Sequence, residues 1–250
     1  MSEREEFDLW DSCERGCWLK LPLAVMRDVG PAVQTLGGIL ELTDKDTFRQ
    51  QAEIAKRARL PIATVRKHLV TLATAGWILC KGREHTRAGR LRRTATVVIP
   101  KSTRKQLVPY GVLPWWACSR AHRFPWASRA VLSIVMGQLL TMKAVVERGD
   151  YDSADWQGEL DNLGGDSRFQ FSLGQLTRET GLSRESVVTA KSHLSKWKVI
   201  SLTRQQRRDG GDDRDVLAPN LGFRVVKTPA GEGLCYISFR EVEGGSDSGQ

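Results

Sequence analysis

One stretch of the chain repeats itself without a gap, and this repeat constrains the fold more than any other feature. When the sequence is slid along itself by 122 positions, RLPIATVRKHLVTLATAGWI (59–78) lies over GLSRESVVTAKSHLSKWKVI (181–200). The apolar residues meet in pairs: Leu60 and Leu182, Val65 and Val187, Leu72 and Leu194, Ile78 and Ile200. Apolar positions spaced by three and four residues bury one side of a helix. The two copies therefore predict the same local structure.

The first copy predicts two helices followed by a hairpin. DTFRQQAEIAKRARL begins after good N-cap residues and predicts a helix over Phe48–Ala58. Pro61 breaks it and suits the first turn of a new helix, predicted over 62–75 and ended by Gly76. WILCK and TATVVIP then predict strands around the basic loop GREHTRAGRLRR. An earlier helix is predicted in PAVQTLGGILEL (31–42).

The second copy predicts the same order of elements. Gly181 supplies a left-handed turn residue and Ser183 an N-cap, and VISLTR, QQRRDGGDDRD and LGFRVVK predict strand, loop and strand. Upstream, WLKLP (18–22) and YGVLP (110–114) echo each other, each ahead of a predicted helix (Pro31 onward and Trp126–Arg148). Their offset of 92 leaves room for an acidic, Gly-rich insert, GDYDSADWQGELDNLGGDS, predicted to be a surface loop.

Charge is concentrated in one segment. Residues 48–105 hold 15 Lys or Arg and two acidic residues, a net charge of +13 in a chain whose total is +9. Residues 1–47 are acidic, and residues 109–250 are nearly balanced. A dense positive segment indicates a polyanionic partner, because each cation that meets a phosphate releases a counterion.

These patterns predict a mainly α fold with small β wings (α+β), arranged as two tandem winged helix-turn-helix domains. The expected organisation is an acidic N-terminal segment (1–17), a basic first domain (18–105), a second domain (106–243) with an acidic insert near 149–170, and a disordered tail (244–250). Forty per cent hydrophobic residues supply enough apolar side chains for two cores.

The string EIAKRARLPIATVRKHLVTLATAGWI resembles the recognition core of winged helix-turn-helix proteins. It departs from the family pattern at Arg59, where glycine is usual, and at Pro61, where Ser or Thr is usual. The second copy has Lys191 and Lys198 in place of the family's leucine and glycine. The two units, each introduced by an aromatic-x-x-Leu-Pro segment, also resemble plasmid replication initiators. That resemblance implies that both domains bind repeated origin sites and that the same protein can dimerise and repress its own promoter.

In such a fold the second helix of the motif lies in the major groove and the wing contacts the backbone or minor groove. The first recognition helix offers Ala63, Thr64, Arg66, Lys67, His68 and Thr71. The first wing offers Lys81, Arg83, Arg87, Arg90, Arg92 and Arg93. The less charged second helix offers Arg184, Glu185, Ser186, Thr189 and Lys191. Its wing mixes arginines with aspartates, so the second domain binds DNA weakly or serves as a dimer or partner surface.

The expected function is sequence-specific binding of double-stranded DNA at repeated or palindromic sites, initiating replication at a plasmid or phage-type origin. The alternatives are a winged-helix transcriptional regulator and a protein-interaction scaffold. The expected partners are DNA, a second copy in a homodimer and replication proteins, but no membrane. No enzymatic activity or cofactor is expected, since phosphate-loop and HExxH motifs are missing. CERGC (13–17) and CSRAH (118–122) lack a tight zinc spacing, so no metal is expected. The expected location is cytoplasmic, on the nucleoid or a plasmid.

Overall fold

The computed structural model describes residues 18–42, 51–81, 84–85, 91–92, 96–119, 123–148, 170–197, 199–205, 214–219, 221–228 and 231–239. Within these residues the protein is mainly helical, with small antiparallel sheets, as predicted for an α+β chain. The N-terminal segment, most of the acidic insert and the C-terminal tail predicted from the sequence lie outside the described residues.

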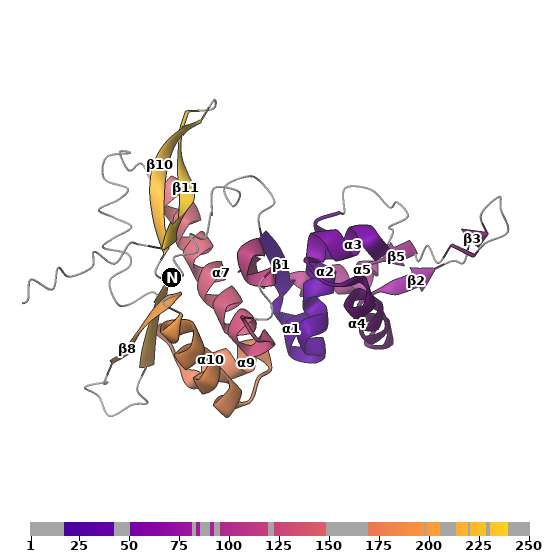
Figure 1. Ribbon diagram of the computed structural model, residues 1–250, viewed down its shortest axis with the longest axis horizontal. Coiled ribbons are helices and arrows are strands. Elements are labelled where there is room, and N and C mark those ends of the chain that lie inside the picture. The colour runs from indigo at the N-terminus through magenta and orange to yellow at the C-terminus, as the bar shows by residue number, and fades with distance from the viewer. Residues whose placement is uncertain are drawn as a thin grey trace, which may run out of the picture.

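The first half of the chain packs around one buried helix (Figure 1). Its elements are β1 (Trp18–Pro22), α1 (Leu23–Val29), η2 (Gly30–Ala32, a 3-10 turn), α2 (Val33–Leu40), α3 (Gln51–Ala58) and α4 (Ile62–Thr74). Val33, Leu36 and Ile39 of α2 are buried. A β-carbon on Gly38 would lie 2.7 Å from the backbone nitrogen of Ala58, so α2 and α3 are in direct backbone contact. The helix predicted over 31–42 is therefore a 3-10 turn plus α2, and α1 was not predicted.

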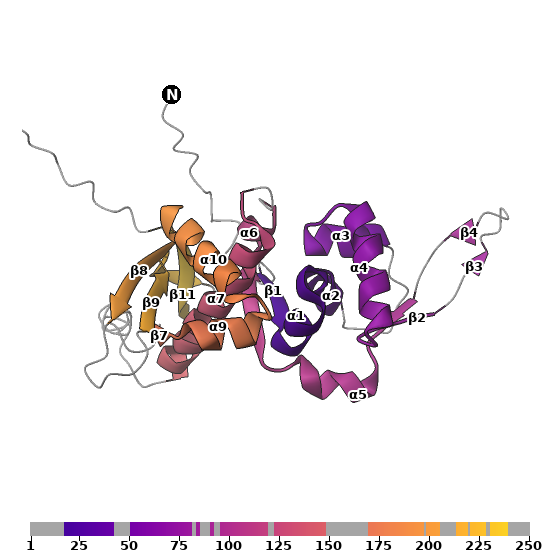
Figure 2. The ribbon, with the colours of Figure 1, turned by 90° about the horizontal axis from the view of Figure 1, so that it is seen from below.

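A two-part hairpin follows α4. β2 (Leu79–Lys81) pairs antiparallel with β5 (Thr96–Val98), and β3 (Glu84–His85) pairs with β4 (Leu91–Arg92) farther out. The chain then forms α5 (Lys101–Arg104) and η3 (Lys105–Leu107). In Figure 2 these two short helices run along the edge of the first half and lead to β6.

The second half has a long central helix and a three-stranded sheet. Its elements are β6 (Tyr110–Pro114), α6 (Trp115–Ser119), α7 (Trp126–Arg148), β7 (Gln170–Phe171), α9 (Leu173–Thr180), α10 (Arg184–Lys196), β8 (Ile200–Gln205), β9 (Arg214–Pro219), β10 (Leu221–Thr228) and β11 (Gly231–Phe239). The sheet order is β7-β9-β8. The predicted helix over Trp126–Arg148 is confirmed.

The repeat found in the sequence is also a repeat of structure. Shifted by 122, the bounds of α3 fall on those of α9, and the bounds of α4 fall on those of α10. The turn residues match as well: Arg59 has φ 53° and Gly181 has φ 71°, both left-handed. A side chain in this conformation costs about 1–2 kcal/mol. The Arg59 guanidinium lies 4.5 Å from the centre of the Trp115 ring, a contact that offsets part of this cost.

The second hairpin differs from the prediction. LGFRVVK was expected to pair with VISLTR, but β8 pairs with β9, from Ile200 opposite Pro219 to Gln205 opposite Arg214. LGFRVVK belongs to β10, which forms a separate hairpin with β11. Sequence alternation indicates that a segment is a strand, but it does not identify the partner strand when several candidates follow one another.

The two echoing segments upstream pair with each other. β1 and β6 are antiparallel, with Trp18 opposite Pro114, Lys20 opposite Val112 and Pro22 opposite Tyr110. Lys20 and Val112 are also equivalent positions of the echo, so the pair is centred on a local pseudo-twofold axis. A β-carbon on Gly111 would lie 2.8 Å from Ser133 Oγ, which shows how closely α7 approaches β6.

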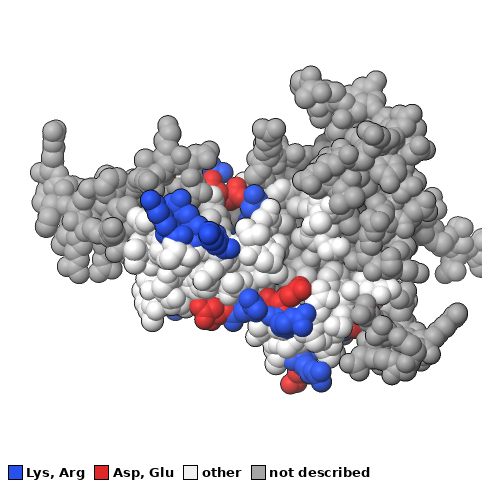
Figure 3. Space-filling view, turned by 180° about the vertical axis from the view of Figure 1, so that it is seen from behind, with Lys and Arg blue, Asp and Glu red and all other residues white. Residues whose placement is uncertain are grey.

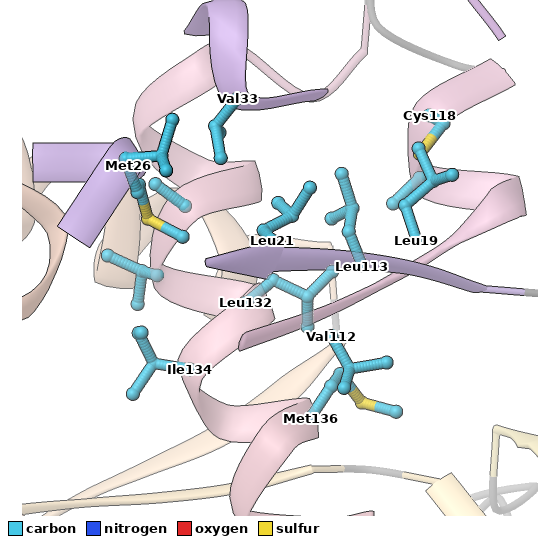
Figure 4. Close-up of a cluster of buried hydrophobic side chains, with 14 of the residues drawn as sticks. Leu19, Leu21, Met26, Val33, Val112, Leu113, Cys118, Leu132, Ile134 and Met136 are labelled. Carbon is cyan, nitrogen blue, oxygen red and sulfur yellow. The ribbon is translucent and has the colours of Figure 1, made fainter. Parts of the chain in front are cut away.

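Buried side chains form one continuous core through both halves, where the composition had suggested two cores. Figure 4 shows its centre, with side chains of β1 and β6 packed against α7: Leu19, Leu21, Val112, Leu113, Leu132 and Met136. The halves also touch where α1 meets α9 and the turn that follows it. A β-carbon on Gly181 would lie 2.9 Å from both the Cα and the carbonyl oxygen of Arg27.

Candidate nucleic-acid interface

α4 presents a polar side because its apolar side is fixed in the core. Val65, Leu69 and Leu72 are buried. The helix begins at Ile62, directly after Pro61, whose φ of −59° and missing N–H suit the start of a helix. This orientation exposes four of the predicted reading residues, Ala63, Arg66, Lys67 and Thr71, and leaves Thr64 half-buried.

Two exposed cations stand side by side in the chain on this surface. The Arg66 Nε atom donates a hydrogen bond to Gln51 Oε1 of α3 at 3.0 Å, which leaves its other guanidinium nitrogens available. Within the described part of the chain, no carboxylate forms an ion pair with Arg66 or Lys67. Both positive charges are thus open to an anionic partner. The Thr71 hydroxyl donates to the Lys67 carbonyl oxygen at 3.2 Å, so it is partly engaged with its own helix.

His68 does not belong to the exposed surface, and its predicted reading role needs correction. Its ring is half-buried, and Nδ1 lies 2.8 Å from Thr35 Oγ1 of α2. Burial, and secondarily the positive charge of Arg129, lower the pKa of His68. The ring is thus engaged with α2 inside the protein. The sequence prediction failed here because the partner hydroxyl comes from a helix distant in the chain.

The basic wing can be placed only in part. Lys81 lies in β2, which pairs with β5, and Arg92 lies in β4, which pairs with β3 farther out along the hairpin. Arg83, Arg87, Arg90 and Arg93 lie outside the described residues. The described strands therefore place the hairpin beyond the end of α4, and its six cations remain predicted site residues.

Three further cations lie on the link between the halves, and we call Lys101, Arg104 and Lys105 the linker cations. All three side chains are exposed. They form no ion pair with any residue that the structure describes. Figure 3 shows a gathering of Lys and Arg atoms on the first half in the view from behind. In the sequence these cations form the run KSTRK (101–105), which lies within the positively charged segment but outside the predicted site.

α10 presents a less basic version of the same surface. Ser183 caps the helix, its hydroxyl oxygen accepting from the Ser186 N–H at 3.1 Å. Arg184, Glu185 and Thr189 are exposed. One cation and one carboxylate side by side give little net attraction for phosphate, in contrast to Arg66 and Lys67 of α4.

Lys191 is the second predicted reader that needs correction. Its side chain is buried and forms an ion pair with Asp215 of β9. The ammonium group thus holds α10 to the sheet and is not available to a base. Lys191 lies 122 positions after Leu69, which is a core residue. The alignment of the two copies therefore contained the signal that Lys191 faces inward.

An aromatic cluster at the end of α10 was not predicted. The ring centres of Phe124 and Trp197 each lie within 6.3 Å of the ring centre of His193. The Trp197 Nε1–H donates to His193 Nε2 at 3.1 Å, so His193 Nδ1 carries the proton and faces Ser128 Oγ at 3.0 Å. Burial, followed by the charge of Lys196, lowers the pKa of His193.

No protein-family model, curated protein or solved structure matches this chain. Among the described residues, His, Cys, Asp and Glu side chains form no group suited to a metal ion. No described helix has the length and apolar character needed to cross a membrane. The proposal below therefore depends on the geometry and charge of the chain itself.

Proposed function

We propose that the protein is a tandem winged-helix protein that binds double-stranded DNA sequence-specifically, with the first half as the main reader. One observation carries the proposal: the unit α3–turn–α4 recurs at a fixed offset as α9–turn–α10, and each copy is followed by an antiparallel hairpin. Two helices in this order, with the second exposed beside a hairpin, form the element that inserts into the major groove in winged-helix proteins.

The charge distribution supports a division of labour between the halves. Arg66 and Lys67 are exposed on α4 and form no ion pair with a described residue, and their side chains suit the N7 and O6 acceptors of guanine. The hairpin and linker cations suit phosphates, which set affinity more than sequence preference. On α10 the corresponding surface has a carboxylate, Glu185, next to Arg184 in the chain. The second half would therefore contribute less to affinity.

The biological role that fits this arrangement best is replication initiation at repeated sites on a plasmid or phage-type origin. A transcriptional regulator with the same chemistry is the second candidate. In either role the protein would bind DNA as a homodimer, or several copies of it would bind along the DNA. Direct repeats of about two helical turns beside the gene would favour the initiator, and a single palindrome in its promoter would favour the regulator.

The direct test is binding of the full chain to random 40-base-pair duplexes, followed by selection of preferred sequences from the same pool. We expect binding in low salt, with a log–log salt slope of about −0.9 for each phosphate neutralised. The absence of binding at low salt would overturn the proposal, and binding without any selected sequence would overturn the reading role of α4.

The variants that divide the roles are Arg66→Ala with Lys67→Ala, and Arg90→Ala with Arg92→Ala. The helix pair should reduce discrimination between selected and random duplexes by about 1–3 kcal/mol per base contact. The hairpin pair should weaken both duplexes alike and flatten the salt slope. Lys56→Ala with Arg57→Ala, two exposed cations of α3, controls for the loss of two charges. If this control lowers discrimination as much as the α4 pair does, α4 has no special reading role.

A further inference from the structure

A buried arginine lies at the junction of the two halves, and no carboxylate of the described residues pairs with it. Arg129 of α7 is only 8% exposed. Its guanidinium forms no ion pair with any described carboxylate, and its Nε atom has no hydrogen-bond partner in the described part of the chain. The centre of the Trp126 ring lies 5.7 Å from the Arg129 Cζ atom. Burying a charge with so little compensation is costly, so stability alone does not explain an arginine at this position.

The polar group that receives Arg129 belongs to the other half. Arg129 Nη1 donates a hydrogen bond to Gln34 Oε1 of α2, whose side chain is buried. Gln34 Nε2 in turn donates to the carbonyl oxygen of Ala58 at 2.8 Å. Ala58 is the last residue of α3, and the left-handed Arg59 follows it. Gln34 thus connects α7 to the turn that sets the angle between α3 and α4.

The next residue of α2 holds α4 itself. The hydroxyl of Thr35, which is fully buried, bonds to Nδ1 of His68. His68 lies one residue after Lys67 and two after Arg66 on α4. Two consecutive residues of α2 therefore fix the turn before α4 and the rotation of α4 about its axis. One of them is in direct contact with the second half.

We propose that Arg129 is a positioning residue: through Gln34 it lets the second half of the protein set the orientation of the α4 reading surface. The DNA-binding part of this inference rests on the function proposed above. The contact chain from Arg129 to His68 does not, because it is a property of the folded protein without DNA.

The first arm of the test uses the free protein. The pKa of His68 would be measured by NMR titration of the full chain, in the native sequence and in Arg129→Met. Because the charge of Arg129 contributes, after burial, to the lowered pKa of His68, its removal should raise that pKa. Arg129→Lys keeps a cationic donor and should restore the native value. An unchanged pKa in a folded Arg129→Met protein would overturn the contact chain.

The second arm measures the ratio of affinities for a selected and a random duplex. Arg129→Met should lower this ratio about tenfold while the affinity for the random duplex stays within twofold, since no phosphate contact is removed. Arg129→Lys should restore most of the ratio. An unchanged ratio would overturn the positioning role even if the His68 pKa moves. Failure of the native protein to bind either duplex would overturn the proposed function instead, and the first arm would stand by itself.

Two further variants separate positioning from loss of stability. Ser133→Ala removes a buried hydrogen bond of α7 to the Ala130 carbonyl and touches neither Gln34 nor His68. It should move neither the pKa of His68 nor the affinity ratio. If Arg129→Met does not fold, Gln34→Glu serves in its place: a carboxylate neutralises Arg129 but cannot donate to Ala58. We then expect a raised pKa of His68 and a lowered ratio, and a native result for both would overturn the proposal.

Discussion

Gly181→Ala tests whether the two halves are packed against each other in solution. Gly181 has φ 71°, and an alanine in this left-handed conformation costs about 1–2 kcal/mol. Its methyl group would also lie 2.9 Å from the Cα and carbonyl oxygen of Arg27, and the backbone of α1 cannot move away as a flexible side chain would. Overpacking of this kind costs about 1–3 kcal/mol more. We expect a total loss of about 2–5 kcal/mol.

Gly76→Ala is the matched control for this change. Gly76 has φ 78°, nearly the same conformation, but apart from its chain neighbours no residue that the structure describes lies within 4 Å of the position of its β-carbon. It should therefore lose only the conformational part, about 1 kcal/mol once the stiffer unfolded chain is considered. Both free energies of unfolding would be measured by urea titration with tryptophan fluorescence and circular dichroism.

Equal losses in the two variants would refute the reasoning, because they would mean that the contact between Gly181 and Arg27 is not made in solution. Arg27→Ala provides a further check. The close contacts are with the backbone of Arg27, so removing its side chain should not rescue Gly181→Ala. A rescue would show that the side chain, and not the position of α1, causes the clash.

Three other outcomes follow from the site. Because burial lowers the pKa of His68 and His193 below 6.5, the unfolded chain binds more protons than the folded protein. The free energy of unfolding, measured from thermal unfolding at a series of pH values, should therefore fall as the pH drops below about 6.5. His68→Gln should make this dependence on pH less steep. Neutralising the linker cations with glutamine should flatten the salt slope for a random duplex by up to about 2.7 if all three meet phosphates, and an unchanged slope would exclude them from the interface. Lys191→Met should lower the free energy of unfolding by about 1–3 kcal/mol, because it leaves Asp215 unpaired. Adding Asp215→Leu should recover most of this loss, and the ratio of affinities for selected and random DNA should stay unchanged in both variants.

The repeat was the part of the fold that the sequence predicted best, because it depends on local periodicity. The helices of both copies have the predicted order and nearly the predicted bounds. Even the left-handed turn is conserved between copies, although an arginine occupies it in the first. Local spacing was sufficient because each unit buries the same apolar side against its central helix.

What the sequence could not predict depends on contacts between distant segments. Pairing of β1 with β6 joins residues about 90 positions apart, and no local pattern selects that partner. The inward turn of His68 requires Thr35 of another helix. The burial of Lys191, in contrast, could have been predicted, because this residue aligns with Leu69, which is buried. We interpreted Lys191 as a DNA-binding residue because its side chain is positively charged.

The register of β1 and β6 bears on how such a chain could have arisen. Lys20 and Val112, the central residues of two related segments, face each other, and the residues on either side pair as they would about the twofold axis of a symmetric dimer. A shorter ancestor with one unit could have formed this strand pair between two separate molecules. Duplication and fusion of its gene would then place both partners in one polypeptide.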